Sequence, residues 1–368
     1  MKLLSTCILS TLMCASLSAQ QGRKADASFE WLASDDIDIR SEWALYESSF
    51  GSSSSLSGRI EYIRNQVDYL PNEEIDPFGF SSSLDESLLG AQIRWKRLVG
   101  KSEWGLTLSG YDGFRNYSSI WIDEYYRQQY SEGGIPGVSY EKPSPAGYGL
   151  DASWRYEAIP AFGFFTVSLG YLQDEVAPGY EIEDLDSSFE LIRGKTLLDT
   201  WTGSIAWEGL LNARMRTSQL IRLTKTTDRE MRYSWSGSVN WLLSDRWISR
   251  SSASYTRENP GFEAWSLSQT FEYTLTDHWI LNATFRYYSD TGQIESANLV
   301  SSAAPSLSSR QAFLSLRYEN NTATTSVSIS TGPYETRYGK TGIGTERFKN
   351  LYSDRDWWWT RLALSHAF

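Results

Sequence analysis

The sequence has no long apolar run. Its 368 residues contain no uninterrupted apolar stretch of the kind that spans a bilayer, and the mean hydropathy is −0.42. A transmembrane helix needs about 20 predominantly apolar residues, so this absence excludes a helical membrane protein. Charged residues make up 21% and hydrophobic residues 40%, a balance that also excludes a disordered chain.

Basic tracts, histidine and cysteine are also scarce. The net charge is −11 and the pI is near 4.9, so we expect no nucleic-acid partner. The two histidines, His278 and His366, have no evident nucleophile beside them, which argues against an enzyme. Both cysteines, Cys7 and Cys14, lie near the N-terminus, so the rest of the chain offers no disulfide framework or thiol nucleophile. We therefore expect no catalytic residue, no cofactor and no metal site.

Residues 1–19 have the features of a removable export signal. Lys2 precedes the apolar segment Leu3–Met13, and Leu17-Ser18-Ala19 forms a small-residue cleavage site. A buried N-terminal helix and a lipid-modified Cys14 are the alternatives. The sequence thus predicts a signal peptide over 1–19 and one domain over 20–368.

What the chain has in abundance is aromatic residues in period-two alternation. The clearest example runs from Trp265 to Tyr288. One face carries Trp265, Leu267, Gln269, Phe271 and Tyr273, and after a turn Trp279, Leu281, Ala283, Phe285 and Tyr287. The intervening residues are mostly Ser, Thr, Asn and Arg. A helix would scatter these apolar side chains around its axis, so the pattern predicts antiparallel strands.

The spacing and the aromatic content favour an all-β transmembrane up-and-down barrel. Aromatic residues gather near the strand ends, as in an interfacial girdle, and the polar faces carry few Lys and Glu residues. Short and long connections alternate, which predicts short periplasmic turns and long external loops. Fifteen strands are readily counted, and a weak first strand around Ser28–Leu32 gives 16. The alternative is 14.

The C-terminal segment ends on an aromatic residue, with Leu362, Leu364 and Phe368 on one face. It resembles the strand that the bacterial barrel-assembly machinery recognises, although His366 departs from the usual apolar residue. With the export signal and the hairpin rhythm, the chain is similar to porin-like outer-membrane β-barrel proteins. The resemblance implies the outer membrane of a Gram-negative-type bacterium, with outer-membrane lipid, lipopolysaccharide and the assembly machinery as partners. A homo-oligomer and a secreted soluble β-protein stay open.

Alternation also assigns charged residues to the barrel lumen. The basic residues predicted to line the pore are Arg94, Lys96, Arg155, Arg214, Arg216, Arg250, Arg286 and Arg317. The acids predicted to face inward are Asp38, Glu42, Glu61, Glu103, Asp151 and Glu272. Rings of Arg and Lys favour anions, whereas a salt-bridged wall would only keep the lumen wet. Both interpretations remain open.

The longest predicted loop contains a candidate constriction. Trp121, Tyr125 and Gln128 have helical spacing, and Asp123, Glu124 and Arg127 lie among them. This segment either folds inward to narrow the channel or packs outward on its neighbours. The sequence as a whole predicts a passive channel for small hydrophilic solutes, with a preference for anions if the basic wall dominates. The alternative is a non-conducting structural or surface-interaction barrel.

Overall fold

The segments with period-two alternation form long strands in the computed structural model. It describes residues 22–368 apart from 52, 75, 132–143, 177–180, 186–187, 193–195, 228, 260, 293–303, 323 and 340–347. The predicted export signal, 1–19, therefore lies outside the described residues. The elements are β1 (Arg23–Ala33), β2 (Ile37–Phe50), β3 (Ser54–Tyr69), β4 (Ser82–Val99), β5 (Ser102–Gly113), α2 (Tyr117–Ser131), β6 (Ala146–Ile159), β7 (Gly163–Val176), β8 (Glu181–Leu185), β9 (Ser188–Ile192), β10 (Thr196–Asn212), β11 (Met215–Thr226), β12 (Arg232–Ser244), β13 (Trp247–Glu258), β14 (Phe262–Thr274), β15 (Trp279–Asp290), β16 (Leu307–Glu319), β17 (Thr325–Tyr338) and β18 (Arg355–Ala367).

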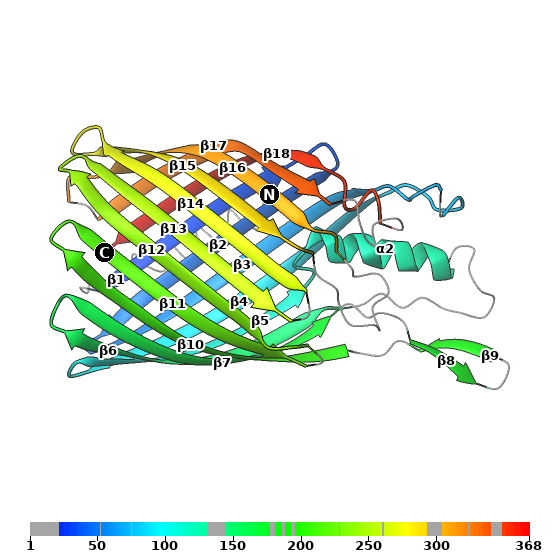
Figure 1. Ribbon diagram of the computed structural model, residues 1–368, viewed down its shortest axis with the longest axis horizontal. Helices are drawn as coiled ribbons and strands as arrows, with labels where there is room; N and C mark the ends of the chain where they lie inside the picture. The colour runs from blue at the N-terminus through cyan, green and yellow to red at the C-terminus, as the bar shows by residue number, and fades with distance from the viewer. Residues whose placement is uncertain are drawn as a thin grey trace.

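Sixteen of these strands close into an antiparallel barrel (Figure 1). Each strand pairs with its neighbours in sequence, except that β7 pairs directly with β10 and β1 closes the ring against β18. Strands β8 and β9 form a separate two-stranded sheet beyond one end of the barrel. The predicted fold class and the count of 16 are confirmed. The weak first strand is also confirmed, and it is longer than predicted.

The outer face carries the large apolar side chains. Leu267 and Phe285 are 54% and 56% exposed, and the same side of their strands carries Trp265 and Trp279. Aromatic pairs mark both ends of this face: Trp247 packs on Tyr273 with ring centroids 4.6 Å apart, and Tyr255 on Trp265 at 4.4 Å. This arrangement matches an apolar band between two aromatic girdles.

The inner face is held together by hydroxyl groups from adjacent strands. The pairs are Ser168–Ser204 at 2.6 Å, Ser218–Ser238 at 2.8 Å, Ser254–Ser266 at 2.7 Å, Thr270–Thr284 at 2.9 Å and Ser315–Ser330 at 2.8 Å. These small polar residues leave room in the lumen, because they do not reach across it. No helix among the described residues is long and apolar enough to span a membrane.

Short turns lie at one end of the barrel and nearly all longer connections at the other, which orients the molecule as predicted. At the short-turn end, Gly100 takes a φ of 60° in the turn from β4 to β5, a conformation that glycine adopts without strain. Two connections at the long-loop end are exceptions, since β1–β2 (Ser34–Asp36) and β13–β14 (259–261) are only three residues long.

Two predicted inward acids, Asp38 and Glu42, in fact lie on the outer face. On β3 the outward position of Ile60, 59% exposed, pairs with Ala44, so the even-numbered residues of β2 point outward. The prediction failed because β2 is more apolar on its inner face, where Ile37 contributes to a buried cluster. Alternation shows which residues of a strand share a face. For β2, hydrophobicity alone gave the wrong answer to which of the two faces points into the barrel.

The long-loop end has an uneven rim. Strands β3 and β4, with 16 and 18 residues, are longer than the 12-residue β13, and they form a raised wall at this end (Figure 1). Helix α2 stands beside this wall rather than lying across the middle of the barrel.

Candidate functional site: the inner wall and the mouth

Glu208 on β10 lies between two of the predicted pore-lining arginines. Arg155 on β6 contacts one of its oxygens at 2.9 Å, and Arg216 on β11 contacts the other at 3.0 Å. The Arg155 guanidinium also lies 4.0 Å from the ring centroid of Phe164. Two positive charges therefore share one carboxylate on this part of the wall.

Glu272 on β14 organises a second cluster. Arg250 reaches it at 3.2 Å and Arg317 at 4.0 Å, while Arg317 also contacts Glu319 at 3.0 Å. This cluster has two positive and two negative groups, so it is neutral. The predicted salt-bridged wall is present here, and it sits beside the more basic cluster around Glu208.

The remaining basic residues that were predicted to line the pore form fewer ion pairs. Arg94 and Lys96 share the inner side of β4, where a hollow of about 140 Å³ is also lined by Arg59 and Glu47. Within the described part of the chain, neither Arg94 nor Lys96 forms an ion pair. Arg286 lies over the ring of Phe313 at 5.1 Å. Arg214 lies in the turn between β10 and β11 rather than on a strand.

Glu208 and Arg59 were not among the residues predicted for this site. Glu208 lies within β10, which continues to Asn212, and alternation along this strand places it inside. Arg59 lies on the inner face of β3, over the ring of Trp43 at 4.7 Å. Alternation along β3 predicts this position, because Arg59 shares a face with the inward-facing Glu61.

The predicted helix exists as α2, and its apolar side is docked. Trp121, 2% exposed, packs on Tyr69 of β3 with ring centroids 5.2 Å apart, and Tyr125 packs on Phe348 at 5.1 Å. Val67 belongs to the same buried cluster. Because Tyr69 and Val67 lie on the inner side of the raised wall, α2 occupies space inside the rim.

Polar residues of α2 fix it to the β3–β4 region. Glu124 accepts hydrogen bonds from Arg127 at 2.6 Å and from Ser82 at 2.7 Å, and Gln128 is bonded to the backbone of Phe80. Burial raises the pKa of Glu124, but the bonds from Arg127, Ser82 and Gln128 outweigh this effect and lower the pKa overall. Asp123 is half-buried on the same helix.

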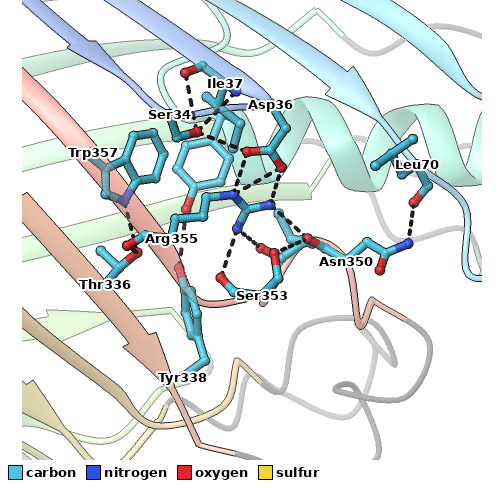
Figure 2. Close-up of polar contacts among 12 residues, drawn as sticks. Ser34, Asp36, Ile37, Leu70, Thr336, Tyr338, Asn350, Ser353, Arg355 and Trp357 are labelled. Atoms are coloured by element: carbon cyan, nitrogen blue, oxygen red, sulfur yellow. Dashed lines mark hydrogen bonds and ion pairs between the residues drawn. The ribbon is translucent and has the colours of Figure 1, made fainter.

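A buried ion pair joins the start of β18 to the β1–β2 turn (Figure 2). Arg355, whose side chain is 4% exposed, contacts Asp36 at 2.7 Å and donates to the carbonyl oxygens of Asn350 and Leu351 at 2.7 Å each. Asn350 in turn donates to the Leu70 carbonyl at 3.2 Å. This network ties the β17–β18 loop to the rim, and it could not be predicted from the sequence because Asp36 and Arg355 are 319 residues apart.

The two histidines make contacts at the short-turn end. His278 lies in the β14–β15 turn with Nδ1 3.1 Å from the Glu319 carbonyl, and His366 Nδ1 is 2.8 Å from the Thr325 hydroxyl. Among the described residues, no group of three or more His, Cys, Asp and Glu side chains is placed to hold a metal ion.

The three residues of the predicted assembly signal lie on β18 and at the chain end. Leu362 is 46% exposed on the outer face, and the register places Leu364 on the same side. The Phe368 amide donates to the Arg23 carbonyl at 2.9 Å, and its ring contacts His366 edge-on at 4.4 Å. Their role in assembly stays a prediction.

Solved structures share this architecture at low sequence identity. A bacterial polysaccharide outer membrane secretin aligns over 95% of this chain and 100% of its own, with a TM-score of 0.53 and 8% identity. CdiB from Acinetobacter baumannii aligns over 95% of this chain and 61% of its own, with a TM-score of 0.56 and 10% identity. The FrpB iron transporter from Neisseria meningitidis aligns over 92% and 67%, with a TM-score of 0.51 and 10% identity.

This is the fold of bacterial outer-membrane β-barrels. No family model and no curated protein matches the chain. At these identities the likeness extends to the fold alone, so the activity of this outer-membrane-type barrel has to be argued from its own residues.

Proposed function

We propose that the protein is a passive, porin-like channel for small hydrophilic solutes in the outer membrane of a Gram-negative-type bacterium. The proposal includes export by a cleavable signal and insertion by the barrel-assembly machinery. It requires no cofactor and no catalytic group. We infer a modest preference for anions from Arg155 and Arg216, which share the carboxylate of Glu208, and from Arg94 and Lys96, which form no ion pair in the described part of the chain.

The exposure of the lumenal arginines carries this proposal. Arg216 and Arg250 are 50% and 43% exposed although they point into a closed barrel. Side chains in a filled lumen would be buried by their neighbours, so this exposure indicates water-accessible space beside the wall. A barrel of 16 strands is wide enough to enclose an aqueous channel.

The position of α2 is compatible with a narrowed but open pathway. Its docked residues pack on the inner side of β3, and Tyr117 at its start packs on Trp357 of β18 and bonds to Tyr338 of β17, so the helix occupies part of the mouth. Solutes small enough to pass the rim would then meet a polar wall of hydroxyl groups and ion pairs.

The proposal is tested by single-channel recording of refolded protein in a planar bilayer under a salt gradient. We expect discrete conductance steps and a reversal potential on the anion-selective side. The double variant Arg94→Gln/Lys96→Gln should move that potential toward cation selectivity, because it removes two lumenal charges that lack ion-pair partners in the described chain.

A matched control is the outward-facing double variant Arg40→Gln/Arg64→Gln on β2 and β3. It removes the same amount of charge from the opposite side of the wall, so the reversal potential should stay near the unmodified value. Folded protein that gives no steps would reject the channel in favour of a structural or surface-interaction barrel. Steps with cation selectivity would reject only the anion preference.

A further inference from the structure

The outer wall has a groove that crosses the middle of the apolar band. Its volume is about 790 Å³, and it extends from β11 to β17. Small residues form its floor and apolar side chains form its sides. The floor includes Gly237, Ala253 and Ala312, and the sides include Trp235, Leu267 and Phe285. Between the girdle residues Trp247 and Tyr255, β13 presents only Ser249, Ser251 and Ala253 to the outside.

Polar side chains lie in this groove, but they bond to one another. Gln269 donates to Ser249 at 2.9 Å and accepts from Ser251 at 2.5 Å. Gln219 accepts from the Trp235 indole at 3.0 Å. A buried amide costs little once its hydrogen bonds are made, so the groove presents a surface that an apolar occupant can cover. These bonds leave few groups to pair with the polar surface of another chain.

A cation lies at the upper end of the groove. Arg310 is exposed, points outward beside Tyr287, and lies four residues above Leu314 toward the long-loop end. Four residues of a tilted strand correspond to roughly 10 Å of height, which places Arg310 near the outer boundary of the apolar band. Lipid phosphates lie just beyond that boundary.

Arg310 is not neutralised by its acidic neighbour. Glu335, its cross-strand partner, is 3.7 Å from Arg337, and Arg337 also pairs with Asp356. Arg310 forms no ion pair with any residue that the structure describes. An apolar groove that ends at an unpaired cation is complementary to a molecule with an acyl chain below an anionic head.

We propose that this groove binds a phosphorylated lipid of the outer leaflet, of the lipid A type. An acyl chain lies against Gly237, Ala253 and Leu267, and a phosphate contacts Arg310. The site is on the outside of the wall, so its occupancy does not depend on whether the lumen conducts. Glu335 weakens binding, since its carboxylate is close to the bound phosphate.

Native mass spectrometry of the refolded full chain, titrated with diphosphoryl lipid A, tests the site. We expect one retained lipid A. Arg310→Gln should weaken its binding about tenfold, as expected when a hydrogen bond to a charged group is lost. Glu335→Gln should strengthen it. The double variant Ala253→Leu/Ala312→Leu fills the floor and should prevent retention, while Ala44→Leu on the outer face of β2 leaves it unchanged.

Three outcomes would overturn the proposal. Equal retention by the unmodified chain and the filled variant would show that the lipid binds elsewhere. An unchanged affinity in Arg310→Gln, with dioleoylphosphatidylcholine retained as well as lipid A, would show that the anionic head is not recognised. A dimer or trimer that the filled variant converts to monomers would make a second copy of the chain the occupant. Each variant is first checked for barrel formation by its circular dichroism and heat-modifiable gel mobility.

Discussion

At the scale of residues, the inner wall shows why a count of arginines does not define a selectivity. Glu272 and Glu319 neutralise Arg250 and Arg317, whereas Arg155 and Arg216 share the single carboxylate of Glu208. Ion pairs this exposed contribute about 0–1 kcal/mol each to stability. Their main effect is therefore on the field inside the lumen.

The Asp36–Arg355 pair gives the mouth a defined response to acid. Burial raises the pKa of Asp36, but the hydrogen bond and charge of Arg355 outweigh this effect and hold the pKa below its ordinary value. Because the pKa of Asp36 is lowered, the pair stabilises the mouth at every pH above the ordinary pKa of an aspartate. This stabilisation is lost as the pH falls through the lowered pKa that Asp36 has in the folded protein. We expect loop closures in single-channel records to increase only below about pH 4 on the long-loop side.

In Asp36→Asn the closures should be frequent at every pH, because Arg355 then lacks its charge partner. The control is Glu74→Gln, which breaks an exposed contact of 3.8 Å with Lys349 and should leave the record unchanged. A pH response that persists in Asp36→Asn would assign it to another group.

At the scale of elements, α2 shows which part of the mouth could be predicted. The spacing of Trp121, Tyr125 and Gln128 correctly predicts a helix. The surface on which it docks could not be predicted, because Tyr69 and Phe348 lie far from it in the sequence and meet it only after the barrel closes. Local periodicity specifies an element, whereas its partner depends on long-range packing.

Trp121→Ala tests whether α2 narrows the pathway. Removing this buried ring should destabilise the docked helix by about 3–5 kcal/mol. We expect faster hydrogen exchange over 117–131 and a higher single-channel conductance, with Gln129→Ala as the control on the same helix. Faster exchange with an unchanged conductance would show that α2 lies outside the route of the ions.

At the scale of the whole molecule, the strand count and the closure of the ring could be predicted. Which face of a strand points into the lumen could not be predicted for every strand. The pairing of β1 with β18 completes 16 strands, as the even-number rule anticipates. The faces of β2 were reversed, because its inner side packs on other residues and is therefore apolar. Glu208 was missed for a different reason, because it lies near the end of β10 and strand ends are harder to predict than strands.

Phe368→Ala separates assembly from stability. Its ring contacts only His366 among the aromatic residues described, so we expect refolding into lipid vesicles to be nearly unchanged. Assembly in cells should fall several-fold if the terminal aromatic is recognised by the insertion machinery. Ser365→Ala, on the inner face of the same strand, is the control. Equal loss in both settings would instead mean that Phe368 serves the barrel itself.

The unequal strands make the molecule asymmetric for anything that approaches it from outside. Six more residues in β4 than in β13 correspond to roughly 15 Å of additional height. The rim is therefore higher at β4 than at β13. A molecule that approaches the mouth along the cell surface therefore meets a higher edge at β4 than at β13, so its access to the mouth depends on the direction of approach as well as on its size.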